Sequence, residues 1–333
     1  MAKINAVITG VGGYVPDYIL TNDELSTMMD TSDEWITTRV GIKERHVLKD
    51  KDLGTSFMAV KAIEDLFQKT GTKPEEIEMI ICATATPDYI LPSCASIIAE
   101  KVGIKNAIAF DLEAACAGFI VALTTAAAFI ESGRYKKILA IGAEKFTSLT
   151  NYEDRTTAPL FGDAAGVVLV EPTEEEVGFI DSVLFTDGIG FSHLGTNGGI
   201  STHPPSHETV DKKMFTIYQE GQYVFKHAVS DMSDAVVKIM ERNHLTKDDV
   251  NWLIPHQANL RIIDAIAQRV GLDYEKVIIN INKYGNTSAA SIPLCLWEYE
   301  NKFKKGDNII LTAFGAGFTW GAVYLKWGYS KQE

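Results

Sequence analysis

The sequence predicts an α/β protein built from two similar halves around a shared core. Short β-rich runs alternate with helical patterns along all 333 residues, an order that is typical of α/β proteins. A weak internal repeat gives each half the same succession of strand, helix, strand, helix, strand and strand. No Gly/Ser-rich or Pro-rich linker separates the halves. We therefore divide the chain into 1–174 and 175–333 and expect both halves to pack as one body.

The repeated segments follow one another in the same order in each half. Those of the first half are "EMIICATATPD" (78–88), "AIAFDLEAACAGFIVAL" (107–123), "KKILAIGAEKF" (136–146) and "AAGVVLVEP" (164–172). Those of the second half are "NWLIPHQANL" (251–260), "VIININKYGNTSAASIPL" (277–294), "DNIILTAFGAGF" (307–318) and "WGAVYLKW" (320–327). The helix over about 116–132 is apolar nearly all round, which predicts that it is buried, and Gly133 is a plausible end for it.

Three residues with useful chemistry stand at the ends of these strands. Segment 107–116 aligns on 277–286 without a gap, so that Cys116 and Asn286 are offset by 170 (286 − 116). Each stands where a strand ends and a helix begins, and His256 also follows a strand. Ligands of open α/β sheets bind at such carboxyl ends of strands. If a pseudo-twofold axis relates the halves, these strand ends converge on one cleft.

Charge and composition argue against several classes of protein. The formal net charge of −13 disfavours nucleic acid as the main partner, because neutralising phosphates takes a basic field. No run of 18 apolar residues is present, and "MAKINAVITGVGGYVP" indicates a first strand and turn, so we expect a cytoplasmic protein without a membrane span. The four cysteines form no C-x-x-C, which signals neither a zinc ribbon nor a thioredoxin motif.

Cys116 is either a small core residue or a nucleophile. A cysteine on the first turn of a buried helix lies at the positive end of the helix dipole, which favours the thiolate. A pKa lowered by about one unit from ~8.5 leaves roughly a quarter of the thiol ionised at pH 7. The alternative, a buried cysteine acting as a small hydrophobe, is the commoner case. We assign that role to the cysteines inside apolar runs, Cys82, Cys94 and Cys295.

Other motifs have a functional and a plain interpretation. His256 and Asn286, each taken alone, fit a structural histidine and a turn or helix cap. The small residues of "FGAGF" (314–318) allow backbone N–H groups to approach an oxyanion, or form an ordinary β-turn. The dinucleotide motif G-x-G-x-x-G fails, because position 15 is Val and Pro16 blocks the helix. A solvated loop is expected rather than a metal site for His193, His203 and His207.

Six motifs together resemble the β-ketoacyl-acyl carrier protein synthase III family, from about residue 4 to 327. They are "TSDEWITTRVGIKERH" (31–46), "EAACAGF", "FGDAAG" (161–166), "IPHQANLRII", "YGNTSAAS" and "FGAGFTWG". The resemblance implies a thiolase-like, five-layered α-β-α-β-α fold with two pseudo-symmetric halves. It also implies a homodimer whose substrates are acyl-CoA and malonyl-acyl carrier protein, and it implies no cofactor and no metal.

The implied reaction is a decarboxylative Claisen condensation that starts a fatty-acid chain. Cys116 attacks an acyl-CoA thioester and becomes S-acylated. His256 and Asn286 then stabilise the enolate that forms as malonyl-acyl carrier protein loses CO₂. The backbone N–H groups of Cys116 and Ala316 hold the oxyanion, and Ala316 stands where many relatives have Gly. An amide at position 286 suits this step, because a carboxylate there would repel the developing charge.

The resemblance also assigns substrate contacts. Trp35 stacks on the CoA adenine, Arg39 and Arg155 are its partners, and Asn259 contacts the pantetheine arm. Lys226 and Arg261 form a basic entrance that docks the acidic carrier protein, which needs only a local positive patch on a chain of net charge −13. The plain interpretation of these two cations is a solvated helix face.

Two residues are implied to line the acyl pocket, Leu91 and Phe314. Leu91 falls where relatives often have Phe, a residue projected into the partner's pocket, so we hypothesise that primers larger than acetyl, including branched ones, are accepted. Three alternatives stay open at this stage. They are a polyketide- or quinolone-type synthase that uses malonyl-CoA, a cysteine acyl-CoA hydrolase that gives free acid, and a non-catalytic binding module that is not acylated.

Overall fold

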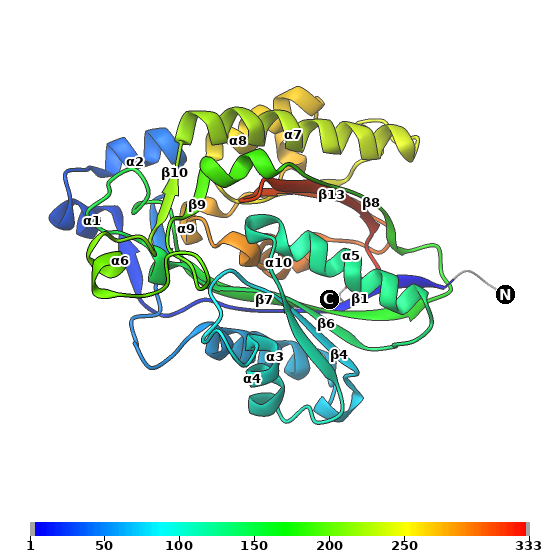
Figure 1. The fold of residues 1–333 in the computed structure, drawn as a ribbon. Coiled ribbons are helices and arrows are strands. Elements are labelled where there is room, and N and C mark those ends of the chain that lie inside the picture. The colour runs from blue at the N-terminus through cyan, green and yellow to red at the C-terminus, as the bar shows by residue number, and fades with distance from the viewer. Residues whose placement is uncertain (1–3, 331–333) are drawn as a thin grey trace.

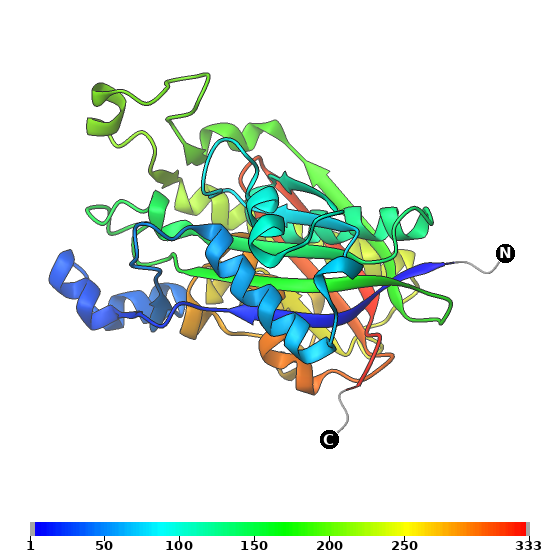
Figure 2. The same ribbon diagram turned by 90° about the horizontal axis from the view of Figure 1, so that it is seen from below.

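Two β-sheets alternate with three layers of helices, and this confirms the five-layered fold (Figure 1). The computed structural model describes residues 4–330. One outer layer holds α3 (Thr55–Thr70) and α4 (Cys94–Val102), and the other holds α7 (Gly221–Arg242) and α8 (Leu260–Val270). The middle layer consists of α5 (Gly118–Glu131) and α10 (Ser291–Tyr299). Figure 2 shows α3 lying across the outer face of the first sheet.

The two sheets have matching strand orders. The first is β1-β7-β6-β4-β5, with bounds β1 (Asn5–Tyr14), β4 (Met79–Ala83), β5 (Ile108–Leu112), β6 (Ile138–Lys145) and β7 (Asp163–Thr173). The second is β8-β13-β12-β11, with bounds β8 (Gly178–Thr186), β11 (Trp252–Pro255), β12 (Asn308–Gly315) and β13 (Thr319–Lys326). A single parallel bridge between Leu253 and Val277 takes the fifth place. The internal repeat is therefore confirmed, whereas the exact boundary at 174/175 stays a prediction.

Continuous apolar runs explain the central strands and helix. All residues of β4 are buried, as expected for a parallel strand covered on both faces. Helix α5 is enclosed between the sheets and buries Phe119, Ile120 and Leu123, which confirms its predicted burial. It ends at Glu131, and Gly133 has the left-handed φ of 73° that favours glycine after a helix.

The start of α5 lies later than the sequence predicts. The helix begins at Gly118, and Cys116 lies in the preceding 3₁₀ turn η2 (Ala115–Ala117). The matching turn of the second half is η6 (Ser288–Ala290), and its first residue, like that of η2, has a left-handed φ of about 45–50°. The structural offset between the turns is thus 173 (288 − 115), and the ungapped pairing of Cys116 with Asn286 is wrong. A short helix, α9 (Ile281–Tyr284), fills the longer loop before η6 and shifts the register.

Glycines near the start of the chain serve packing rather than dinucleotide binding. The segment with Gly10 and Gly12 is part of strand β1, which pairs with β7 along its length. A Cβ at Gly12 would collide with the backbone oxygen of Ala62 in α3. The glycine therefore allows α3 to lie directly on the sheet, and the rejection of a G-x-G-x-x-G loop is confirmed.

The remaining elements surround the carboxyl ends of the central strands. They are β2 (Ile19–Thr21), α1 (Asn22–Met28), α2 (Asp33–Val40), β3 (Glu44–His46), β9 (Leu194–Thr196), α6 (His207–Asp211) and β10 (Ile217–Gln219). Short 3₁₀ turns lie at η1 (Pro74–Glu76), η3 (Phe146–Leu149), η4 (Gly188–Ser192), η5 (Tyr274–Lys276) and η7 (Glu300–Lys302). Among residues 4–330, no helix has both the length and the apolar character needed to cross a bilayer.

Candidate active site

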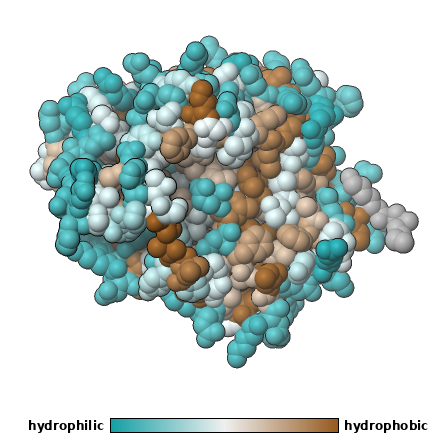
Figure 3. All heavy atoms as spheres, in the orientation of Figure 1, coloured by the Kyte–Doolittle hydropathy of each residue, from teal (hydrophilic) through white to brown (hydrophobic). Residues whose placement is uncertain are grey.

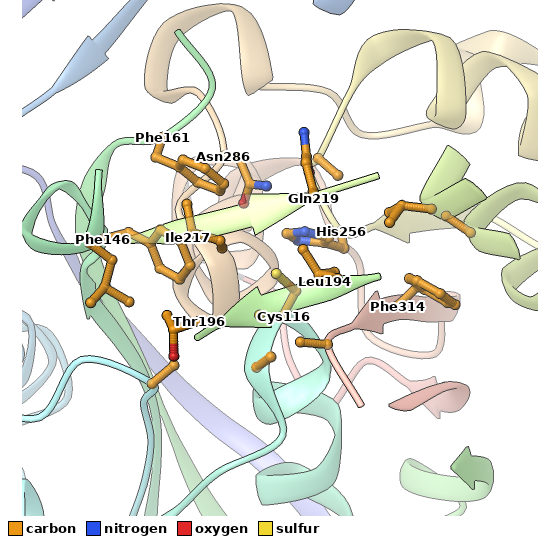
Figure 4. Close-up of a pocket in the computed structure, with 18 of the residues that line it drawn as sticks. Cys116, Phe146, Phe161, Leu194, Thr196, Ile217, Gln219, His256, Asn286 and Phe314 are labelled. Carbon is orange, nitrogen blue, oxygen red and sulfur yellow. The ribbon is translucent and has the colours of Figure 1, made fainter. Parts of the chain in front are cut away.

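One cavity of about 290 Å³ lies where the two sheets meet, and it collects the predicted site residues. Cys116, His256, Asn286, Phe314 and Ala316 all line it. Figure 4 shows the sulfur, the imidazole and the amide pointing toward the same space. The rest of the wall is mostly apolar and includes Phe146, Phe161, Leu194, Ile217, Ala228 and Met232. The convergence expected from the strand ends is therefore present, although the residues are not strictly equivalent.

The thiol of Cys116 is neutral in this site, and the expected lowering of its pKa is wrong. Burial raises the pKa to about 12, and the negative charges of Glu144 and Glu113 act in the same direction. A hydrogen bond from Ser288 opposes them but does not compensate. Desolvation outweighs the helix end here, because Cys116 lies two residues before α5 begins.

His256 is held as a neutral imidazole beside the thiol. Its backbone N–H donates to the carbonyl of Thr312 at 2.8 Å, which fixes the residue where β11 ends. The Nδ1 atom lies 2.7 Å from Oγ of Ser291, the first residue of α10. Burial lowers the imidazole pKa to about 3, so the ring carries no charge at neutral pH. With Nδ1 engaged by Ser291, Nε2 is the atom left for a ligand.

Asn286 is fixed by its backbone and by one side-chain bond. Its N–H donates to the carbonyl of Leu160, and its carbonyl accepts from the N–H of Gly162. These two bonds form a parallel β-bridge between Asn286 and Phe161. The Oδ1 atom accepts from the N–H of Ser288 at 2.9 Å. This leaves the Nδ2 group as the free donor of the amide, facing the cavity together with the imidazole.

The end of β12 lies close to the backbone of the turn η2. A Cβ built on Gly315 would come within 2.7 Å of the Cys116 backbone nitrogen. Only glycine permits this approach, which places the neighbouring residue Ala316 on the cavity wall beside Cys116. Cys116 of η2 and Ala316 of the turn after β12 thus lie on the wall of the same cavity.

Two further groups of predicted residues lie away from the cavity. On α2, the Trp35 ring has the guanidinium of Arg39 at 4.9 Å and that of Arg155 at 4.8 Å from its centroid. Asn259 caps α8 by accepting from the N–H of Arg261 at 2.9 Å. The basic residues Lys226 and Arg261 lie on the adjacent helices α7 and α8, where Arg261 covers the ring of Phe225.

Leu91 is not brought to the cavity of its own chain. It belongs to an exposed apolar loop in which Tyr89, Ile90 and Leu91 are 64%, 64% and 83% exposed. The histidines set aside in the sequence analysis lie in loops and at the start of α6, and no cluster within the described part of the chain could hold a metal ion.

Three polar residues of the site were missed by the sequence analysis. Ser291 holds the imidazole, Ser288 touches the thiol and holds the amide, and Glu144 is a fully buried acid bonded to Ser288. The available signal for Glu144 was an acidic residue inside the apolar run "ILAIGAEKF". The two serines follow Asn286 in a motif whose hydroxyls we attributed to helix capping.

The chain is similar to one enzyme family over its full length. Models described as 3-oxoacyl-[acyl-carrier-protein (ACP)] synthase III and its C terminal match residues 110–188 and 240–327. Beta-ketoacyl-[acyl-carrier-protein] synthase III 2 of Bacteroides thetaiotaomicron is 61% identical, covering 100% of this chain and 99% of that protein. The synthase III of Porphyromonas gingivalis is 58% identical over 99% of this chain and 98% of that protein.

Solved structures agree with this similarity. The 3-oxoacyl-[acyl-carrier-protein] synthase III of Aquifex aeolicus superposes with a TM-score of 0.90 at 41% identity, covering 97% of this chain and 100% of that one. The priming β-ketosynthase of the R1128 polyketide pathway has the same TM-score at 32% identity, covering 98% and 97%.

Proposed function

The chain belongs to the 3-oxoacyl-[acyl-carrier-protein] synthase III family, and we propose that Cys116, His256 and Asn286 carry the reaction of that family. The enzyme is an acyltransferase that condenses an acyl-CoA primer with malonyl-acyl carrier protein, releases CoA and CO₂, and starts fatty-acid synthesis. The observation that carries the assignment is the meeting of these three side chains in one cavity. Its test is whether the acyl group passes from CoA to Cys116 and then into 3-oxoacyl-acyl carrier protein.

The first half-reaction transfers the primer to Cys116. The sulfur attacks the thioester carbon, and the resulting oxyanion accepts hydrogen bonds from the backbone N–H groups of Cys116 and Ala316. Because these donors are fixed by the turn η2 and by the close approach of Gly315, they need no reorganisation as charge develops. CoA then leaves, and the apolar wall of the cavity holds the acyl chain.

The second half-reaction makes the carbon–carbon bond. Loss of CO₂ from the malonyl group puts negative charge on the thioester oxygen, where Nε2–H of His256 and Nδ2–H of Asn286 donate. For this step we assign the imidazole proton to Nε2, so that Nδ1 accepts from the Ser291 hydroxyl 2.7 Å away. Each such donor contributes about 2.7–4 kcal/mol to stabilising the developing charge. The carbanion attacks the acyl-Cys116 carbonyl, and the sulfur leaves.

We assign no cofactor to this reaction. The nucleophile and the donors are protein groups, and decarboxylation of a malonyl thioester itself supplies the carbanion. Acyl-CoA is therefore a substrate, and acyl carrier protein is the second partner.

We further propose that two chains form a homodimer across β5 and α5. Strand β5 is an edge of the first sheet, and its first residue, Ile108, is half exposed. Beside it, Val121 and Phe129 of α5 and Leu184 of β8 line a shallow groove. Figure 3 shows apolar side chains gathered over the middle of this face. A cytoplasmic location is also part of the proposal and is supported by the four free cysteines.

The dimer gives Leu91 a role in primer selection. Because Leu91 is 83% exposed in its own chain, it is free to enter the acyl pocket of a partner. We expect isobutyryl- and isovaleryl-CoA to be turned over at least as fast as acetyl-CoA. In Leu91→Phe, the added bulk should lower the branched-to-acetyl ratio about tenfold, within the range for a misfit in an apolar pocket. Steady-state rates with the three primers measure this ratio.

Two outcomes would count against this account of primer selection. A strong preference of the unaltered enzyme for acetyl-CoA would refute the larger pocket. Light scattering that gives the mass of a single chain, rather than twice that mass, would remove the route by which Leu91 reaches the pocket.

The residues assigned to CoA and those assigned to the carrier protein should affect different Michaelis constants. Trp35→Ala removes the ring that contacts the guanidinium groups of Arg39 and Arg155, and we expect a KM for acyl-CoA raised about tenfold, since stacking on a base contributes ~1–3 kcal/mol. Arg261→Glu reverses a charge beside Lys226 and should raise the KM for malonyl-acyl carrier protein in a salt-dependent way. Each variant serves as the control for the other. A rise of the same KM in both variants would contradict the assignment.

A further inference from the structure

A buried acid lies directly behind the cavity and has no part in the steps above. Glu144 stands near the end of β6 and is fully buried. Its carboxyl oxygens accept from the hydroxyls of Ser288 at 3.0 Å, Thr86 at 2.6 Å and Thr84 at 3.2 Å, and from the N–H of Ala85 at 3.1–3.2 Å. These donors are neutral. A buried carboxyl held in this way is costly to ionise, and such groups cluster at functional sites.

Ser288 connects this acid to the nucleophile. Its hydroxyl donates to Oε1 of Glu144 at 3.0 Å. The same hydroxyl interacts with the sulfur of Cys116, and this interaction favours the thiolate. Its backbone N–H donates to Oδ1 of Asn286, which fixes the residue in place. The three groups therefore form one chain from thiol to hydroxyl to carboxylate. A hydroxyl that donates to a carboxylate can accept a proton from the thiol on its other side.

The acylation step needs a proton acceptor close to the sulfur of Cys116. Burial raises the pKa of Cys116 to about 12, so little thiolate exists at neutral pH. Burial lowers the pKa of His256 to about 3, which makes the imidazole a weak base. Burial raises the pKa of Glu144 to about 7, although its four donors oppose the shift. A group with a pKa near the working pH is the most effective general base.

We propose that Glu144 takes the thiol proton of Cys116 through the Ser288 hydroxyl during acylation and returns it at the end of the cycle. This role rests on the proposed function. Glu144 acts through Ser288 and does not touch the substrate.

The proton movements balance. As sulfur forms its bond to the acyl carbon, the thiol proton passes to Ser288 Oγ, and the original hydroxyl proton passes to Glu144. The C–S bond to CoA breaks, and the CoA thiolate takes one proton from solvent. When condensation later expels the Cys116 thiolate, Glu144 returns its proton to Ser288, which reprotonates the sulfur. The enzyme ends as it began.

Glu144 is also hydrogen-bonded to a residue of a second cleft. Thr86, which donates to Oε2 of Glu144, lines a second, polar cleft together with Thr55 and Asp88. This cleft is separate from the acyl cavity. Thr86 therefore connects the acid to a cleft other than the cavity that receives the acyl chain.

The other ionisable groups around Glu144 lie on the elements packed against β6. Cys116 of η2 and Cys82 of β4 are the thiols whose charge interacts with it. A hydrogen bond with Cys94, together with burial, keeps the pKa of Cys82 well above its ordinary value. The carboxylates of Asp111 and Glu113 act on those two thiols. Lys145 is turned away, since its Nζ donates to the carbonyls of Asp50 and Leu53.

The pH profile of acylation tests the relay. Rapid-quench mass spectrometry with acetyl-CoA measures the rate at which the protein gains one acetyl group. In the unaltered enzyme we expect this rate to rise as pH increases through about 7, where Glu144 loses its proton, and then to level off. In Glu144→Gln the inflection near 7 should be absent, the rate at pH 8 should fall about 10²-fold, and it should rise with hydroxide concentration.

Two further variants complete the experiment. Ser288→Ala breaks the chain but keeps Glu144, and it should lose the same inflection, so the test stands even if Glu144→Gln fails to fold. Asp163→Asn is the matched control: burial raises the pKa of that carboxyl to about 6, and it holds Leu48 and Thr147, away from the sulfur. It should keep the inflection.

The outcomes separate the relay from the proposed function. The relay alone is overturned if the unaltered enzyme shows no inflection near pH 7. It is also overturned if the inflection persists in both Glu144→Gln and Ser288→Ala and their acylation rates stay within about threefold of the unaltered enzyme's rate. Failure of the unaltered enzyme to acquire an acetyl group at any pH overturns the proposed function, and the relay with it.

Discussion

Cys116→Ala is expected to abolish acyl transfer from acyl-CoA and to lower condensation by at least about 10³-fold, because Cys116 is the one thiol among the described residues that line the cavity. His256 and Asn286 remain in place in this variant. It should therefore still release CO₂ from malonyl-acyl carrier protein, giving acetyl-acyl carrier protein. Intact-mass spectrometry of the protein and chromatography of the carrier-protein products measure both effects.

Cys82→Ala is the matched control for this prediction. Cys82 lies fully buried in β4, packed beside Cys94, and has no access to the cavity. We expect it to keep acylation and to lose only about 1 kcal/mol of unfolding free energy. Acylation of Cys116→Ala at the rate of the unaltered protein would show that the nucleophile lies elsewhere.

The second large effect concerns the two nitrogen donors. His256→Ala and Asn286→Ala should both accept an acyl group at Cys116 but condense about 10²–10³-fold more slowly, the loss that follows removal of one oxyanion donor. Asn286→Asp should be worse than Asn286→Ala, because a carboxylate repels the enolate and cannot donate when ionised. Single-turnover condensation by the pre-acylated variants measures the step directly.

Acylation is the internal control for these variants, since it reports that the cavity is still formed.

The neutral state of His256 adds a pH criterion. With its pKa lowered to about 3, the imidazole does not titrate between pH 5 and 9, so decarboxylation should show no inflection near the ordinary histidine value. Unimpaired condensation in either alanine variant would remove that residue from the assignment.

The repeat and the core were predictable because their signals are local. Strands β4 and β6 are continuous apolar runs, and α5 is apolar on all sides, so periodicity alone indicates elements enclosed between layers. The matching strand orders of the two sheets agree with the repeated succession of segments, although that succession alone does not predict them.

The sequence alone did not predict which residues of the two halves correspond in the structure. Residues 107–116 and 277–286 align without a gap in sequence, yet α9 forms in the second half and moves the helical turn by three residues. The first residue of each turn, Ala115 or Ser288, has a left-handed backbone conformation. Because neither residue is glycine, the sequence gives no sign of this conformation. As a result Asn286 precedes its turn, whereas Cys116 lies within one.

Electrostatics of the site depended on partners that lie far apart in the chain. The helix-end argument for Cys116 considered only its own segment, whereas the apolar wall that raises its pKa comes from both halves. Glu144 is bonded to Thr86 across 58 positions and to Ser288 across 144. An acidic residue within an apolar strand indicates that its side chain is buried, but it does not indicate which groups form hydrogen bonds with it.

A chase experiment follows the acyl group from CoA to Cys116 and then into the condensation product. The protein is mixed with isotopically labelled acetyl-CoA, freed of excess CoA, and then given malonyl-acyl carrier protein, while peptide mass spectrometry follows the label. The account predicts that the label appears on Cys116 first and then moves, with loss of CO₂, into 3-oxobutyryl-acyl carrier protein. Label on another residue, or its release as free acetate without a new carbon–carbon bond, would contradict it.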